Sequence, residues 1–218
     1  MGLEQGYCTV GKEAEDEFVE RRSRFIGYCR PVQTEQEALD FIESIRKRHW
    51  DATHNVYAYV LRQGGICRYS DDGEPQGTAG VPVLDVLRKE NIVDCVVVVT
   101  RYFGGILLGG GGLVRAYSHA ARLGVDAAER VNMRLCIRGR ICCSYAQYGR
   151  VQALVAAHGG RVEDTVFTQE VTVLFYLPAE DVGGLQQALT DYSADTILVE
   201  ELEKIFLPII KNGQNDER

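Results

Sequence analysis

Apolar positions in the first half of the chain repeat with the periods of helices and strands. Thr34 followed by Glu37 forms a capping-box pair, and apolar residues at helical spacing then predict a helix that ends near residue 49. Alternation over residues 53–61, a glycine pair and a second apolar run at 66–69 predict a β-hairpin. The other elements expected here are a strand at 21–29, a helix with Pro82 in its first turn and a buried strand at 96–99.

A glycine-rich loop separates that buried strand from a helix expected at 113–124. The loop region contains six of the chain's 23 glycines, which are Gly104, Gly105 and the run Gly109 to Gly112. Because ordering a glycine costs roughly 0.5 to 1 kcal/mol more than ordering an alanine, four in succession need a physical reason. One reason is an anion site, since free amides and the helix dipole attract negative charge at a helix start, where Arg115 also lies. The alternative is that the glycines let helix and strand pack closely while the arginines form a solvated face.

An acidic loop over residues 70–80 follows the hairpin. Asp71, Asp72 and Glu74 bring together three carboxylates, the type of ligand that hard cations prefer. However, their spacing does not match an EF-hand, and acidic turns commonly cap their own backbone. We therefore favour a hydrogen-bonded loop and expect no metal and no cofactor.

The second half of the chain predicts the order strand, helix, strand, strand, helix, strand. The expected segments are 134–145, 147–158, 161–167, 170–177, 179–192 and 196–206. This order is typical of a ferredoxin-like domain. We expect an N-terminal domain over residues 1–130, a C-terminal domain over 131–210 and a loose polar tail over 211–218. No constellation of charges marks the C-terminal domain, which indicates a recognition or scaffolding role.

Composition and cysteine content indicate the cellular compartment in which we expect the protein. The 218 residues are 45% hydrophobic and 25% charged, which suits a soluble chain of one large or two small domains. Because the sequence has neither an apolar run of about 18 residues nor a charged leader, we expect no membrane segment and no export signal. The odd number of seven cysteines, with no CxxC pair, favours reduced thiols in the cytoplasm.

The distribution of charge limits where nucleic acid can bind. A chain with a formal net charge of −7 has no bulk attraction for nucleic acid, so any such binding is local. Residues 1–20 hold six carboxylates against one lysine, whereas residues 21–130 hold 15 Lys and Arg against 13 Asp and Glu. The central block can therefore present a basic face.

Three stretches of the sequence resemble the signature of the YigZ/IMPACT family. They are residues 51–55 (DATHN), residues 70–82 (SDDGEPQGTAGVP) and residues 99–117 (VTRYFGGILLGGGGLVRAY). The resemblance extends over about residues 3–207 and points to the bacterial YigZ branch.

This resemblance implies an α+β fold of two domains. The N-terminal domain is expected to resemble the second domain of ribosomal protein S5, a fold shared with domain IV of elongation factor G. The C-terminal domain is expected to have the ferredoxin-like βαββαβ fold of that factor's domain V. Eukaryotic relatives of the N-terminal domain restrain the amino-acid-starvation kinase by competing for its ribosome-associated activator. The family thus implies a link to translation and leaves the biochemical role of its bacterial members open.

From the resemblance we expect a non-enzymatic module that contacts RNA, the ribosome or a translation-associated protein. The expected phosphate partners are Arg101 and Arg115, with the amides of Gly109 to Gly112 as a cradle. Tyr102 or Phe103 is expected to offer a stacking surface beside them.

An enzyme is the second hypothesis. His54 and Asn55 begin a strand that should lie beside the glycine loop, where a histidine most often has a structural role. In the enzyme hypothesis, His54, the acidic loop and the glycine loop converge on a phosphorylated small molecule. A separation of more than about 10 Å between His54 and those carboxylates, with no pocket between them, would exclude it.

Overall fold

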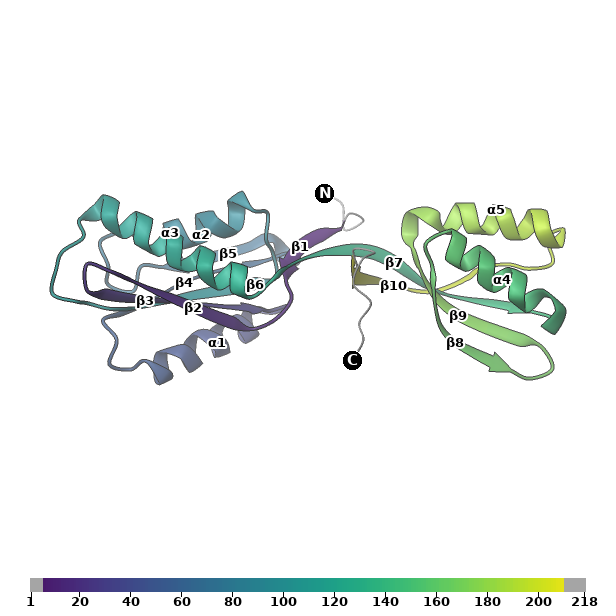
Figure 1. Ribbon diagram of the computed structural model, residues 1–218, viewed down its shortest axis with the longest axis horizontal. Coiled ribbons are helices and arrows are strands. Elements are labelled where there is room, and N and C mark those ends of the chain that lie inside the picture. The colour runs from purple at the N-terminus through teal and green to yellow at the C-terminus, as the bar shows by residue number, and fades with distance from the viewer. Residues whose placement is uncertain (1–5, 210–218) are drawn as a thin grey trace. The chain divides into compact units, whose positions relative to one another are not determined.

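The computed structural model describes residues 6–209, which form two structural units (Figure 1). Tyr7–Asn132 forms the N-terminal unit, and Gly6 with residues 133–209 forms the C-terminal unit. Both units combine helices with antiparallel sheets, so the predicted α+β class is confirmed. The expected tail at 211–218 lies outside the described residues.

The N-terminal unit is built on a five-stranded antiparallel sheet with the order β2-β3-β6-β4-β5. Its strands are β2 (Ala14–Glu20), β3 (Ser23–Pro31), β6 (Cys95–Tyr102), β4 (His54–Leu61) and β5 (Ile66–Ser70). Helices α2 (Gly80–Lys89) and α3 (Gly110–Ala127) pack on one face, and α1 (Glu35–Arg48) packs on the other (Figure 1). The remaining elements are the short strand β1 (Tyr7–Val10) and the 3-10 helix η1 (Gln63–Gly65).

Strand β6 is buried on both of its faces. Val97 and Val99 belong to the apolar cluster beneath α2 and α3, whereas Val96 and Val98 belong to the cluster beneath α1. A strand covered on both sides needs apolar residues at every position. This explains why residues 96–99 form a continuous apolar run instead of an alternating one.

Helix α3 approaches β3 through two glycines. A Cβ atom on Gly27 would lie 2.0 Å from the carbonyl oxygen of Ala120, and one on Gly124 would lie 2.7 Å from that of Gly27. Close packing between this helix and the sheet therefore depends on Gly27 and Gly124, which lie outside the glycine run.

The C-terminal unit has the element order βαββαβ. It consists of β7 (Arg130–Cys143), α4 (Tyr145–Ala157), β8 (Arg161–Phe167), β9 (Val171–Pro178), the 3-10 helix η2 (Ala179–Asp181), α5 (Val182–Ser193) and β10 (Glu200–Pro208). The strands lie in the order β10-β7-β9-β8 with antiparallel pairing. Both helices lie on the same face of the sheet (Figure 1), where Ile141, Phe175 and Leu185 form part of a fully buried core. The ferredoxin-like prediction is confirmed.

The hydrophobic pattern of the sequence does not predict β1 or β2. Strand β2 lies at the edge of the sheet, and four of its seven side chains are carboxylates. Charged residues are common on edge strands because they discourage pairing with other chains, and they obscure the strand pattern. Only Ala14 and Phe18 of this strand pack against the core.

Two element boundaries also differ from the prediction. Helix α3 begins at Gly110, ahead of the predicted start at residue 113, and continues past Gly124 to Ala127. Strand β7 begins at Arg130 instead of near residue 134. The glycine run therefore forms the first turn of α3 and is not a loop that precedes it.

Candidate functional site

The acidic loop of residues 70–80 is held by its own carboxylates. Asp71 accepts hydrogen bonds from three backbone amides of the loop, at 2.8 to 3.1 Å. Asp72 accepts a hydrogen bond from the amide of Asn55 at 2.6 Å and forms an ion pair with Arg46 at 3.0 Å. Both carboxylates stabilise the loop. Among residues 6–209, no group of three or more His, Cys, Asp or Glu side chains is arranged to hold a metal ion.

Glu74, the third carboxylate of the loop, lies at the centre of a buried polar cluster. We call His54, Glu74, Arg101 and Tyr117 the Glu74 cluster. The Tyr117 hydroxyl donates to Glu74 Oε1 at 2.7 Å, Arg101 Nη1 donates to the same oxygen, and His54 Nε2 lies 3.7 Å from it. The other imidazole nitrogen, Nδ1, lies 2.7 Å from the carbonyl oxygen of Asp72. Burial, and then the Glu74 carboxylate, raise the pKa of Tyr117 well above its ordinary value.

Arg101, one of the two expected phosphate partners, lies in the interior of the domain and not at its surface. Arg101 is only 5% exposed, and its Nη2 atom lies 3.5 Å from the hydroxyl oxygen of Ser23. Its guanidinium carbon lies 5.4 Å from the ring centroids of both Phe25 and Phe103, and its Nε atom is buried with no hydrogen-bond partner in the described part of the chain. Arg101 therefore acts in the interior of the domain.

The other predicted site residues near Arg101 differ in how far they are exposed to solvent. The Tyr102 hydroxyl donates to Asp51 Oδ1 at 3.1 Å, and burial together with this bond raises the pKa of Tyr102. Asn55 is buried and accepts a hydrogen bond from the Thr100 hydroxyl at 2.8 Å. Phe103 is 45% exposed, so its ring, not that of Tyr102, is open to stacking.

Three glycines of the predicted site are explained by the local backbone. A Cβ atom on Gly104 would lie 2.1 Å from the carbonyl oxygen of Arg22. Gly105 and Gly109 have φ angles of 83° and 72°, in the left-handed region that favours glycine. These positions need glycine for the path of the chain itself.

Gly110, Gly111 and Gly112 form the first turn of α3 and leave their amides unpaired. Within residues 6–209, none of these three N–H groups is bonded to an acceptor, and no side chain caps the helix. A Cβ atom on Gly111 would meet nothing within 4 Å, so packing does not require glycine there. The geometry leaves this turn accessible to a negatively charged group.

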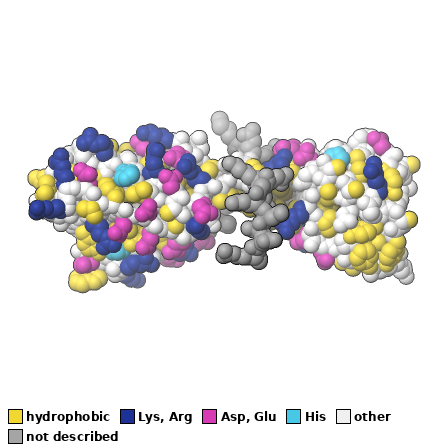
Figure 2. All heavy atoms as spheres, in the orientation of Figure 1, with side chains coloured by type: hydrophobic (Ala, Val, Ile, Leu, Met, Phe, Trp, Pro, Cys, Tyr) yellow, Lys and Arg dark blue, Asp and Glu magenta, His cyan; other side chains and the backbone are white. Residues whose placement is uncertain are grey.

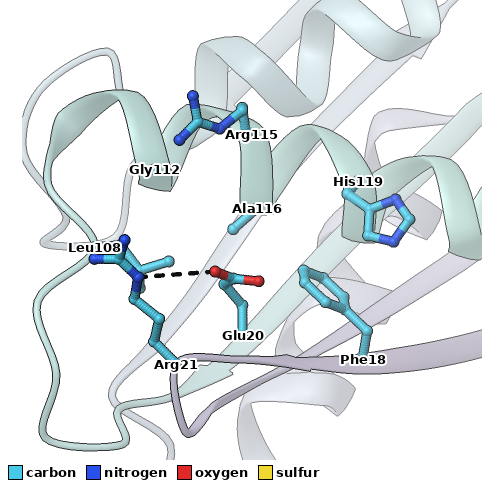
Figure 3. Close-up of a pocket in the computed structure, with 8 residues that line it drawn as sticks. All are labelled: Phe18, Glu20, Arg21, Leu108, Gly112, Arg115, Ala116 and His119. Atoms are coloured by element: carbon cyan, nitrogen blue, oxygen red, sulfur yellow. Dashed lines mark ion pairs between the residues drawn. The ribbon is translucent and has the colours of Figure 1, made fainter.

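A pocket of about 230 Å³ lies beside this turn, between α3 and the β2–β3 hairpin (Figure 3). Its polar lining consists of Glu20, Arg21, Arg115 and His119, and its apolar lining includes Phe18, Leu108 and Ala116. Figure 3 shows that Arg115 and His119 come from α3, whereas Phe18, Glu20 and Arg21 come from β2 and the turn that follows it. Arg115 forms no ion pair with any described residue, and Arg21 Nε lies 3.9 Å from Glu20.

Arg21 and Arg22 occupy the two central positions of the β2–β3 turn. Both have left-handed φ angles, 46° and 67°, which Asn and Gly adopt more readily. Arg21 Nη1 donates to the carbonyl oxygen of Leu107 at 3.4 Å, so the turn lies against the glycine loop. We call Arg21, Arg22, Arg115 and the amides of Gly110 to Gly112 the α3 basic surface. Figure 2 shows Lys and Arg side chains together with apolar ones at this end of the N-terminal unit.

Arg115 and the glycine amides of this surface could be identified from the sequence, but the β2–β3 turn could not. The signal was the pair Arg21-Arg22 between two strands. It could not be recognised as a hairpin turn because β2 was not predicted.

Known proteins match both halves of the chain. Residues 21–125 match the Impact N-terminal domain, and residues 141–196 match a domain of unknown function, DUF1949. The chain is 37% identical over 202 residues to the IMPACT family member YvyE of Bacillus subtilis strain 168. The aligned residues cover 92% of this chain and 93% of YvyE. The chain belongs to the IMPACT family. Among other IMPACT family members, YigZ of Escherichia coli strain K12 is 32% identical over 187 residues, covering 84% of this chain and 92% of YigZ.

The family resemblance seen in the sequence is thereby confirmed. The match to eukaryotic relatives covers a smaller part of the chain. Human Protein IMPACT is 34% identical over 96 residues, 41% of this chain and 29% of the human protein. A solved structure described as that of a hypothetical protein has a TM-score of 0.58 and 29% identity, covering 92% of this chain and 99% of its own. No helix in residues 6–209 has both the length and the apolar composition needed to cross a membrane.

Proposed function

We propose that this IMPACT family protein is a non-enzymatic, cytoplasmic binding module linked to translation, and that it contacts the phosphate backbone of RNA through the α3 basic surface. One observation carries the proposal. The first three amides of α3 have no acceptor among the described residues, while exposed arginines lie beside them. Such amides and the helix dipole favour an anion, and guanidinium groups bind phosphate oxygens with good geometry.

The backbone of the β2–β3 turn supports the same proposal. A residue other than glycine in a left-handed conformation costs about 1 to 2 kcal/mol, because its Cβ atom approaches the following carbonyl. Arg21 and Arg22 both occupy that region, where Asn-Gly would be less strained. The cost is understandable if two positive charges are required at the tip of this hairpin.

Fluorescence anisotropy with a labelled single-stranded RNA tests the proposal. We expect Arg115→Gln to weaken binding about tenfold, equivalent to about 1.4 kcal/mol, for RNAs of different sequence, because it removes a charged hydrogen bond to phosphate. Arg150→Gln is the matched control, because Arg150 is also an exposed helical arginine but lies on α4. Equal affinity of the two variants, or no RNA binding by the unmodified protein, would overturn the proposal. Capture of a protein partner that resists added salt would favour a protein ligand instead.

An enzyme remains the second candidate because the Glu74 cluster brings two predicted residues together. His54 Nε2 lies 3.7 Å from Glu74 Oε1, well inside the limit that would have excluded the hypothesis. However, Glu74 is bonded to both Arg101 and Tyr117, and no member of the cluster lines the pocket described above. The Glu74 carboxylate, which catalysis would need, is thus already hydrogen-bonded to neighbouring side chains.

Phosphorus NMR separates the two candidates. The protein is incubated with phosphorylated sugars and nucleotides, and new resonances are compared between the unmodified protein and His54→Gln. An enzyme would produce new resonances that the variant does not produce. A binding module would produce none, and His54→Gln would bind RNA as the unmodified protein does.

A further inference from the structure

The pocket beside α3 has room for no more than about one nucleotide. Its volume of about 230 Å³ is below the roughly 300 to 1,000 Å³ that is typical of sites for drug-sized ligands. It is bounded by the β2–β3 hairpin on one side and by α3 on the other. An RNA chain that passes over the α3 basic surface would therefore place at most one nucleotide in it.

The two arginines of the pocket suit the oxygens of a terminal phosphate. Arg21 and Arg115 contribute two guanidinium groups, and the His119 imidazole lies one helical turn after Arg115. A terminal phosphate carries about −1.5 to −2 at neutral pH, whereas each phosphate within a nucleic-acid chain carries one negative charge. Glu20, 3.9 Å from Arg21 Nε, offsets one positive charge, so the match to the end of a chain rests on the third free oxygen of a terminal phosphate, which gives both guanidinium groups an acceptor.

The other lining residues suit the sugar and base of a ribonucleotide. The Glu20 carboxylate would repel a free phosphate, but a carboxylate is a good acceptor for ribose hydroxyl groups. Phe18 lines the apolar side, and the His119 ring meets it edge-on, with ring centroids 4.6 Å apart. Aromatic rings of this kind pack against bases without regard to sequence.

We infer that this pocket binds a ribonucleotide through its terminal phosphate. The inference rests on the proposed function, since it assigns the end of the RNA to the pocket and the rest of the RNA to the α3 basic surface. Arg21 and Arg115 hold the terminal phosphate, Glu20 accepts hydrogen bonds from the ribose, and Phe18 with His119 contacts the base.

Anisotropy measurements on the full chain test this assignment. One short RNA is prepared with a 5′-phosphate, with a 3′-phosphate and with hydroxyl groups at both ends, and adenosine monophosphate serves as a competitor. We expect one of the phosphorylated RNAs to bind about tenfold more tightly than the hydroxyl form. Arg21→Gln should reduce that preference at least threefold, because Arg21 holds the terminal phosphate, whereas Arg150→Gln, which changes an arginine of α4, should leave the preference unchanged.

The outcomes distinguish this inference from the proposed function. Equal affinity of all three RNAs overturns the pocket assignment and leaves the RNA-binding proposal intact. Binding of adenosine monophosphate without binding of RNA supports the pocket assignment, identifies a free nucleotide as the ligand and overturns the proposed function. A terminal-phosphate preference that survives both Arg21→Gln and Arg115→Gln places the end of the RNA elsewhere and overturns the assignment.

Discussion

Glu74 is the residue on which the polar interior of the N-terminal unit depends. It accepts hydrogen bonds from Arg101 and Tyr117, and the side chains of both Glu74 and Arg101 are almost entirely buried. A buried charge is tolerated only when a partner offsets the loss of its hydration. The buried polar contacts of this region are therefore explained by stability before any activity is invoked.

Replacing Glu74 should destabilise the protein strongly. In Glu74→Gln, the Arg101 guanidinium stays buried without its counter-charge, so we expect the free energy of unfolding to fall by about 3 to 5 kcal/mol. Urea denaturation measures the change. The control is Glu13→Gln, which removes an exposed ion pair with Arg30 at 3.6 Å and should cost less than about 1 kcal/mol. Similar losses in both variants would show that the buried pair contributes no more to stability than an exposed ion pair does.

Tyr117 should make the protein less stable in alkali. Burial and Glu74 hold its pKa well above the ordinary tyrosine value of about 10, so above that pH the unfolded chain loses a proton that the folded chain retains. Stability from this group is thus present below about pH 10 and decreases as the pH rises further. Between pH 9 and 11, the free energy of unfolding should decrease less steeply in Tyr117→Phe than in the control Tyr69→Phe, which changes an exposed tyrosine. Equal slopes would contradict the prediction.

Helix α3 carries two sets of glycines with different physical reasons. Gly27 of β3 and Gly124 let the helix lie close to the sheet, whereas a Cβ atom would have room at Gly110 and Gly111 of its first turn. Glycine lowers helix stability relative to alanine, so the first turn is less stable than it needs to be for folding alone. At this scale, access of an anion to the amides is the reason we propose for Gly110 and Gly111.

Two alanine substitutions should therefore have opposite effects on stability. Gly27→Ala forces a methyl group against the Ala120 carbonyl and should cost about 1 to 3 kcal/mol or more. Gly111→Ala meets no atom within 4 Å and should stabilise the protein by roughly 0.5 to 1 kcal/mol. Thermal unfolding of both variants checks this pair. A loss of stability in Gly111→Ala would mean that the run is needed for the fold after all.

The whole molecule is acidic, so the proposed RNA contact must be confined to one region. The formal net charge is −7, and the basic groups assigned to RNA are Arg21, Arg22 and Arg115. A local contact of this kind should release few counter-ions, unlike a surface that is basic throughout.

The salt dependence of RNA binding should reflect those three residues. About 0.7 counter-ions are released for each phosphate contact on a single strand, so the logarithm of affinity should fall with the logarithm of salt concentration with a slope of about −2. Removing one arginine in Arg22→Gln should make the slope less steep by about 0.7. A slope near zero would contradict an electrostatic contact, and a much steeper one would require basic residues outside this surface.

Most elements of both units, and the order of elements in the C-terminal unit, could be predicted from the sequence because they depend on local periodicity, whereas the N-terminal architecture was expected from the family resemblance alone. The capping pair Thr34 and Glu37 is present as expected, with the Glu37 amide donating to the Thr34 hydroxyl at 3.2 Å. The βαββαβ order of the second half is likewise local information, and the family motifs support the same fold. Strand β2 escaped prediction because its charged, edge position removes the alternation on which such predictions depend.

Only the tertiary structure decided which arginine is available to a ligand. Arg101 and Arg115 flank the same glycine loop and are chemically identical, yet one is buried against Glu74, 27 positions away in sequence, and the other lines an open pocket. Likewise, Arg21 reached the same pocket only through the pairing of β2 with β3. The sequence by itself determined which residues can carry charge and which segments form helices and strands. The packing of distant segments determined which of those charges lose their water to an internal partner and which remain free to bind.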